Sequence, residues 1–71
     1  MATVASAIKK IRYSLHMGQR EFGKTIGVTQ QSVYSYEAGT RKPSLATLKI
    51  IKQIATENNI EFNLEDFLNY D

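Results

Sequence analysis

The stretch from Gln19 to Glu37, QREFGKTIGVTQQSVYSYE, constrains the fold more than any other part of the chain. Its apolar residues recur at helical spacing on both sides of a corner at Gly27. Glycine tolerates a positive φ, so Gly27 can end a first helix, and Thr29 can cap a second helix that begins at Gln30. Because each helix is too short to be stable alone, the pattern predicts two helices packed together across a tight turn.

The second of these helices has an outer face of uncharged polar side chains. The residues on it are Gln30, Gln31, Ser32, Tyr34 and Ser35. A solvated helix face ordinarily carries Lys and Glu, whereas glutamine can pair with adenine through two hydrogen bonds and serine can serve several bases. The pattern favours a helix-turn-helix over residues 19–37 whose second helix contacts base edges in the major groove. A polar face without any partner is the alternative.

Within this face we expect Gln30, Gln31 and Ser35 to contact bases directly. Ser32 and Tyr34 are expected to make secondary contacts with bases or backbone. The remaining large residues of the helix, Val33 and Tyr36, lie on a different stripe and should pack inward.

Residues 8 to about 57 resemble the DNA-binding domain of the Cro/repressor (Xre) family of helix-turn-helix regulators. The matching residues are Gln19, Glu21, Phe22, Gly23, Gly27, Val28, Thr29, Val33, Tyr36, Glu37, Gly39, Arg41, Lys42, Pro43 and Ser44. The segment TQQS at the start of the second helix is especially similar to lambdoid phage repressors, in which the two glutamines contact operator bases. The resemblance implies an all-α, compact five-helix lambda-repressor-like domain.

A second group of residues is expected to contact DNA phosphates. Its members are Gln19, Arg20, Thr29, Arg41 and Lys42. Free N–H groups and the positive end of the dipole attract phosphate to a helix N-terminus, where Gln19 and Arg20 lie. The resemblance adds that Gln19 contacts a phosphate and braces Gln30. Alternatively, Gln19 only opens its helix, and Arg20 is an ordinary surface cation.

The first helix is predicted over residues 5–16, with one apolar stripe in the core. In the family, the arginine that matches Arg12 pairs with the glutamate that matches Glu37. The resemblance therefore implies an ion pair between Arg12 and Glu37 that ties the first helix to the reading helix. The alternative is two independent surface charges.

The C-terminal part of the chain predicts two further helices. Ser44 should cap a helix with an apolar stripe. A short fifth helix is expected at about residues 64–69, because residues 60–71 carry too many large apolar side chains for a disordered tail. Since family members usually bind operators as two-fold dimers, residues 60–70 are expected either to cover the core or to form a homodimer contact on DNA.

Composition sets the remaining bounds. Seventy-one residues fit one domain, residues 1–71. Without cysteine, and with His16 as the single histidine, the chain offers no metal or catalytic constellation, so we expect no enzyme, cofactor or small-molecule substrate. No apolar run reaches membrane length, which favours a cytoplasmic protein. The resemblance implies that the cell is a bacterium or a phage-infected host.

The charges are distributed unevenly along the chain. All nine basic residues lie within residues 1–52, whereas residues 53–71 hold five acids and no base. This asymmetry favours a basic face for nucleic acid. The leading hypothesis is a sequence-specific transcriptional regulator of phage or bacterial Cro-like type that binds a double-stranded DNA operator. The alternative is a small antirepressor or antitoxin-like module that binds a partner repressor protein through the same surface.

Overall fold

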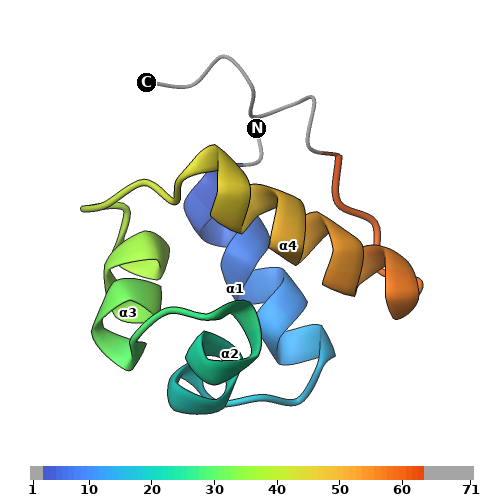
Figure 1. Cartoon of the computed structure of the whole chain (residues 1–71), viewed down its shortest axis with the longest axis horizontal. Helices are drawn as coiled ribbons and strands as arrows, with labels where there is room; N and C mark the ends of the chain where they lie inside the picture. The colour runs from blue at the N-terminus through green and yellow to red at the C-terminus, as the bar shows by residue number, and fades with distance from the viewer. Residues whose placement is uncertain (1–2, 64–71) are drawn as a thin grey trace.

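Residues 3–63 are described by a computed structural model of the chain. They form four α-helices and no strand: α1 (Val4–Ser14), α2 (Gln19–Ile26), α3 (Gln30–Ala38) and α4 (Leu45–Glu57), shown in Figure 1. The all-α class is confirmed for this part of the chain. The count of five helices is not met, because the described residues contain four and the fifth helix predicted over residues 64–69 lies outside them.

Short polar residues start three of the helices. The side chains of Thr3, Thr29 and Ser44 each accept a hydrogen bond from the backbone N–H three residues further on, which satisfies one of the free donors of each first turn. Gly18 precedes α2 and supplies no side-chain cap. The predicted starting points of α2, α3 and α4 are therefore those of the structure.

The first helix ends two residues earlier than predicted. It runs from Val4 to Ser14 instead of residues 5–16, and Leu15 is its C-cap. His16 follows with φ 57°, in the left-handed region, and this conformation ends the helix. The amide of Met17 then donates to the carbonyl of Arg12 at 3.2 Å, which turns the chain toward α2.

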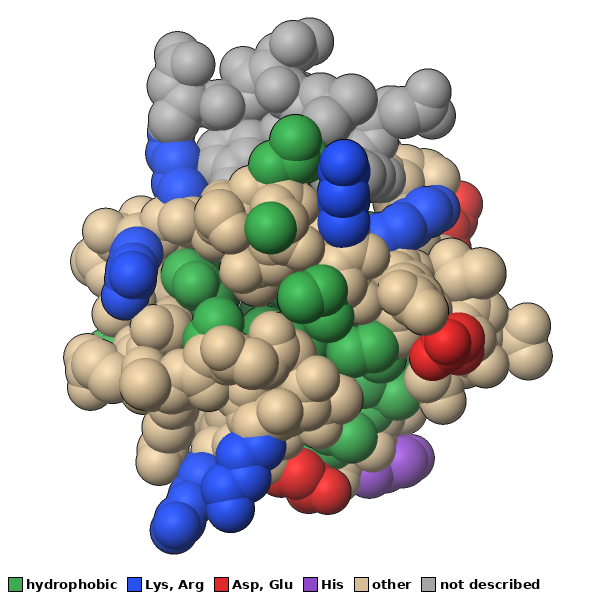
Figure 2. Space-filling model, in the orientation of Figure 1, with side chains coloured by type: hydrophobic (Ala, Val, Ile, Leu, Met, Phe, Trp, Pro, Cys, Tyr) green, Lys and Arg blue, Asp and Glu red, His purple; other side chains and the backbone are tan. Residues whose placement is uncertain are grey.

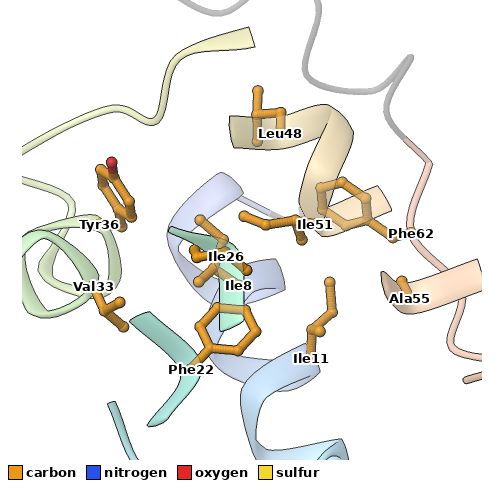
Figure 3. Packing of buried hydrophobic residues seen from close by; sticks show 10 residues of the cluster. All are labelled: Ile8, Ile11, Phe22, Ile26, Val33, Tyr36, Leu48, Ile51, Ala55 and Phe62. Atoms are coloured by element: carbon orange, nitrogen blue, oxygen red, sulfur yellow. The ribbon is translucent and has the colours of Figure 1, made fainter. Parts of the chain in front are cut away.

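One apolar core joins the four helices (Figure 3). Its buried residues are Ile8, Ile11, Phe22, Ile26, Val33, Tyr36, Leu48, Ile51, Ala55 and Phe62. Phe62, which follows α4, is only 5% exposed, and its carbonyl accepts a hydrogen bond from Lys52 Nζ at 2.9 Å. The start of the C-terminal segment thus covers the core, while most of the proposed dimer segment, residues 64–70, lies outside the described residues.

The corner between α2 and α3 depends on two glycines. Gly27 has φ 82°, and the amide of Val28 donates to the carbonyl of Gly23 at 2.8 Å. A Cβ atom at Gly23 would lie 2.8 Å from the carbonyl oxygen of Val28, closer than real Cβ contacts. Gly23 therefore allows the backbone of the turn to lie directly against α2.

Gly23→Ala should destabilise the fold although alanine is the better helix former. The propensity gain is about 1 kcal/mol, but overpacking against a backbone atom costs about 1–3 kcal/mol. We expect a net loss of about 1 kcal/mol and a fall in Tm of about 4–8 °C. Thermal unfolding followed by circular dichroism measures this shift.

Gly18→Ser is the matched control, because a Cβ atom there meets nothing within 4 Å. Serine caps a helix better than glycine by about a few tenths of a kcal/mol, so Tm should rise slightly. A rise in Tm for Gly23→Ala as well would show that the turn does not need the close approach.

Candidate nucleic-acid interface

The outer face of α3 presents uncharged polar side chains to solvent. Gln30 and Gln31 are exposed, the side chain of Tyr34 is 57% exposed, and Ser35 is half-buried. Val33 and Tyr36 lie on the opposite side in the core, as the sequence predicts. This arrangement leaves the two amides and the phenol of α3 accessible to a ligand of matching hydrogen-bonding pattern.

An open hollow lies at the start of this face. Gln19 of α2 lines it together with Gln30, Gln31 and Tyr34 of α3. The turn thus brings Gln19 beside the first residues of α3, although it lies eleven positions before Gln30 in the sequence. The family resemblance implies that Gln19 braces Gln30 at this place. The bond that the structure gives Gln19 is a different one, from its Nε2 to Oε1 of Glu37 at 3.3 Å.

Ser32 does not lie on the exposed outer face of α3, in contrast to the other residues predicted there. It is only 7% exposed, so the expectation that it shares the outer face is wrong. Its Oγ accepts hydrogen bonds from Thr29 Oγ1 at 3.1 Å and from Arg41 Nη1 at 3.0 Å. A hydroxyl oxygen has two acceptor positions, and both are thereby occupied within the protein.

The spacing of the sequence contained a signal for this inward position. Ser32 stands four residues before Tyr36, so the two side chains lie on one side of the helix. A small polar residue at this spacing from a buried tyrosine is therefore expected to face the core and not the solvent.

The ion pair expected between α1 and α3 is present. Arg12 Nε lies 2.6 Å from Glu37 Oε2, and Arg12 Nη2 lies 2.9 Å from Glu37 Oε1, a bidentate arrangement. Arg12 Nη1 also donates to the carbonyl of Met17 at 3.0 Å. The two side chains are 9% and 5% exposed, so the pair is largely removed from solvent.

Arg12 stays positively charged throughout the neutral pH range. The hydrogen bond to Glu37 raises the pKa of Arg12 above its ordinary value, which is already far above neutrality. A raised pKa adds stability that disappears only as pH rises through the folded-state value, so Arg12 contributes equally at every neutral pH. The guanidinium carbon also lies 4.5 Å from the centre of the exposed Tyr13 ring, a cation–π contact.

The expected phosphate-contacting residues lie around the polar face. Arg20, Thr29, Arg41 and Lys42 are exposed. Arg41 follows the end of α3, and its guanidinium reaches back to Ser32 in the first turn of that helix. Its amide donates to the carbonyl of Ser35 at 3.3 Å, which holds the loop against α3.

Basic side chains do not form one continuous patch on the face seen in Figure 2, where Lys and Arg are dispersed. Residues 3–63 contain nine Lys and Arg and four Glu, an excess of positive charge. Such a distribution suits contacts with phosphates at separate points better than binding to a single compact anion.

Residues 3–63 contain neither a candidate membrane span nor a cluster of metal ligands. No helix there is long and apolar enough to cross a membrane. No group of three or more His, Cys, Asp or Glu side chains in that range is placed to hold a metal ion.

The comparisons with known proteins agree with this geometry. The helix-turn-helix family model matches residues 8–54, about two thirds of the chain, and the match includes α2, α3 and most of α1 and α4. The chain belongs to the Xre-like helix-turn-helix family.

Its relatives differ in length. An uncharacterized HTH-type transcriptional regulator of Bacillus subtilis, YgzD, is 37% identical over 60 residues, 83% of this chain and 91% of that protein. An uncharacterized HTH-type transcriptional regulator of Sinorhizobium medicae is 37% identical over 51 residues, 72% of this chain. This chain spans only 37% of the length of the Sinorhizobium protein. No solved structure matches significantly.

Arg12→Met should strongly destabilise the helix-turn-helix protein. The change leaves the Glu37 carboxylate buried, with Gln19 Nε2 at 3.3 Å as its remaining hydrogen-bond partner among residues 3–63. Removing one member of a buried pair costs about 3–5 kcal/mol. Urea unfolding at several protein concentrations measures this loss.

The double variant Arg12→Met/Glu37→Met is the control, because it removes both charges at similar volume. We expect its stability to return to within about 1 kcal/mol of wild type. A double variant as unstable as Arg12→Met alone would mean that the loss comes from packing of the arginine stem and not from an unpaired charge.

Proposed function

We propose that this chain is a sequence-specific DNA-binding transcriptional regulator of Cro-like type, which places α3 in the major groove of an operator. The observation that carries the proposal is the exposed hydrogen-bonding face of α3, held at a fixed angle by the glycine corner and by the pair of Arg12 with Glu37. Membership of the Xre-like helix-turn-helix family supports it. The relatives in Bacillus and Sinorhizobium are named transcriptional regulators, which agrees with this role.

The residues divide into two roles under this proposal. Gln30, Gln31 and Ser35 contact bases, and Tyr34 contacts a base or the backbone beside them. Phosphate contacts come from Gln19, Arg20, Thr29, Arg41 and Lys42. Ser32 does not contact a base under this proposal, because its side chain is buried and its oxygen already accepts two hydrogen bonds within the protein.

The regulator would act as a two-fold dimer on DNA, in the cytoplasm of a bacterium or of a phage-infected cell. Selection of bound sequences from a random DNA pool tests this, and a palindromic winner with half-sites about 10 base pairs apart is the expected result. Affinity for the winner should exceed affinity for pool DNA by about a thousandfold or more. The absence of any enriched sequence would overturn the proposal.

A second function is favoured by one observation. Tyr34 is 57% exposed in the middle of the polar face, and exposed tyrosine is enriched where proteins bind one another. The same face of α3 would then bind a partner repressor, as an antirepressor or an antitoxin-like module does. Binding to a purified repressor, with no footprint on DNA, distinguishes this function from the first.

Gln31→Ala should weaken binding to the selected operator by about 1–3 kcal/mol while hardly affecting nonspecific DNA, because a bidentate contact to a base is lost and no charge is removed. Titration of both DNAs by fluorescence anisotropy measures the ratio. Gln53→Ala removes an exposed amide from α4, whose Nε2 bonds to Glu57 at 3.3 Å, and should leave both affinities unchanged. Equal losses on the two DNAs for Gln31→Ala would contradict its role as a base contact.

Arg41→Ala should weaken specific and nonspecific binding alike. Since one cation no longer neutralises a phosphate, the plot of log affinity against log salt should flatten by about one unit. The measurement is a salt series from low to physiological ionic strength. An unchanged slope would show that Arg41 makes no phosphate contact.

A further inference from the structure

Ser32 is a polar residue with no place among the base-contacting residues. It lies in the first turn of α3, and its side chain is buried beneath the face formed by Gln30 and Gln31. Its Oγ accepts from Arg41 Nη1 at 3.0 Å and from Thr29 Oγ1 at 3.1 Å, while its amide donates to Thr29 Oγ1 at 3.1 Å. The serine therefore joins the helix cap to a cation that follows the helix in sequence.

Arg41 is attached to α3 at two separate points. Its amide donates to the carbonyl of Ser35 at 3.3 Å, and the amide of Thr40 donates to the same carbonyl at 3.0 Å. The guanidinium then reaches back to Ser32, nine positions earlier. Within residues 3–63 this is the single hydrogen bond of the guanidinium. Most of its five N–H donors are therefore available to a ligand, and the residue is exposed.

We propose that Ser32 is a positioning residue, which holds the guanidinium of Arg41 in place for a DNA phosphate beside the bases contacted by α3. The inference rests on the proposed function. A free arginine side chain loses rotamer freedom when it binds a phosphate, and fixing one N–H beforehand reduces that loss. The planar guanidinium still offers donors in the geometry that phosphate oxygens accept. Ser32 thus strengthens DNA binding without touching DNA.

A double-mutant cycle on Ser32 and Arg41 tests the inference. Ser32→Ala should weaken binding to the selected operator by about three- to tenfold, the effect of releasing one ordered side chain. The salt slope should stay that of wild type, because the cation still reaches its phosphate. In the Arg41→Ala background, Ser32→Ala should change affinity less than twofold by the same argument, since no guanidinium remains to be held.

The matched control cycle pairs Ser32 with Lys24, an exposed cation of α2 that makes no hydrogen bond to it. In this control cycle the losses in DNA affinity caused by the two substitutions should add. A structural role of Ser32 would weaken binding equally in every background, and that result would overturn the inference. Ser32→Cys, which keeps the shape of the side chain with a larger atom that accepts hydrogen bonds only weakly, repeats the cycle if Ser32→Ala unfolds below the assay temperature.

The outcomes separate this inference from the proposed function. If the wild-type chain enriches no DNA sequence, the proposed function fails and the inference fails with it. If the wild type binds its operator and Arg41→Ala flattens the salt slope, but the losses of Ser32 and Arg41 simply add, the inference alone fails.

Discussion

The buried pair between Arg12 and Glu37 is the interaction on which the orientation of α3 depends. Apart from Ser32, the buried residues of α3 are Val33 and Tyr36, a narrow apolar contact that resists separation from the core better than rotation about the helix axis. Glu37 follows directly, and its bidentate bond to Arg12 fixes that rotation against α1. The pair is weak evidence for stability as such, because desolvation offsets much of the attraction between buried charges. The main contribution of the pair is to fix the orientation of α3 against α1.

The same carboxylate extends this control to the neighbouring helix. Glu37 Oε1 accepts from Arg12 Nη2 and from Gln19 Nε2, so one side chain contacts both α1 and the first residue of α2. Gln19 in turn lines the hollow beside Gln30 and Gln31. The orienting network therefore reaches the edge of the proposed interface through Gln19, and the Gly23 corner sets the distance between α2 and α3. The charged pair thus fixes the rotation of α3 against α1, and close packing at Gly23 sets the distance of α3 from α2.

Local signals in the sequence were sufficient for much of this architecture. Capping residues at Thr29 and Ser44 and the positive φ at Gly27 depend on neighbours within a few positions, so the starts of α3 and α4 and the corner could be predicted. The pair of Arg12 with Glu37 spans 25 positions, and only the family resemblance indicated it. The early end of α1 at Ser14 was missed because histidine at position 16 does not signal a left-handed conformation as glycine would.

The bond between Ser32 and Arg41 shows why the site was harder to predict than the fold. The sequence places Arg41 after α3 and predicts a cation that contacts a DNA phosphate. It does not show that the loop turns back against α3, because that turn depends on backbone hydrogen bonds to the Ser35 carbonyl. Under the proposed function, that return would fix the place at which Arg41 meets a phosphate relative to Gln30 and Gln31. Phosphate contacts set the register and orientation of a protein on the duplex but carry no sequence information, so discrimination between bases would still come from the glutamines. Under the proposed function, Arg41 would therefore add affinity and register on every DNA, and the glutamines would add specificity.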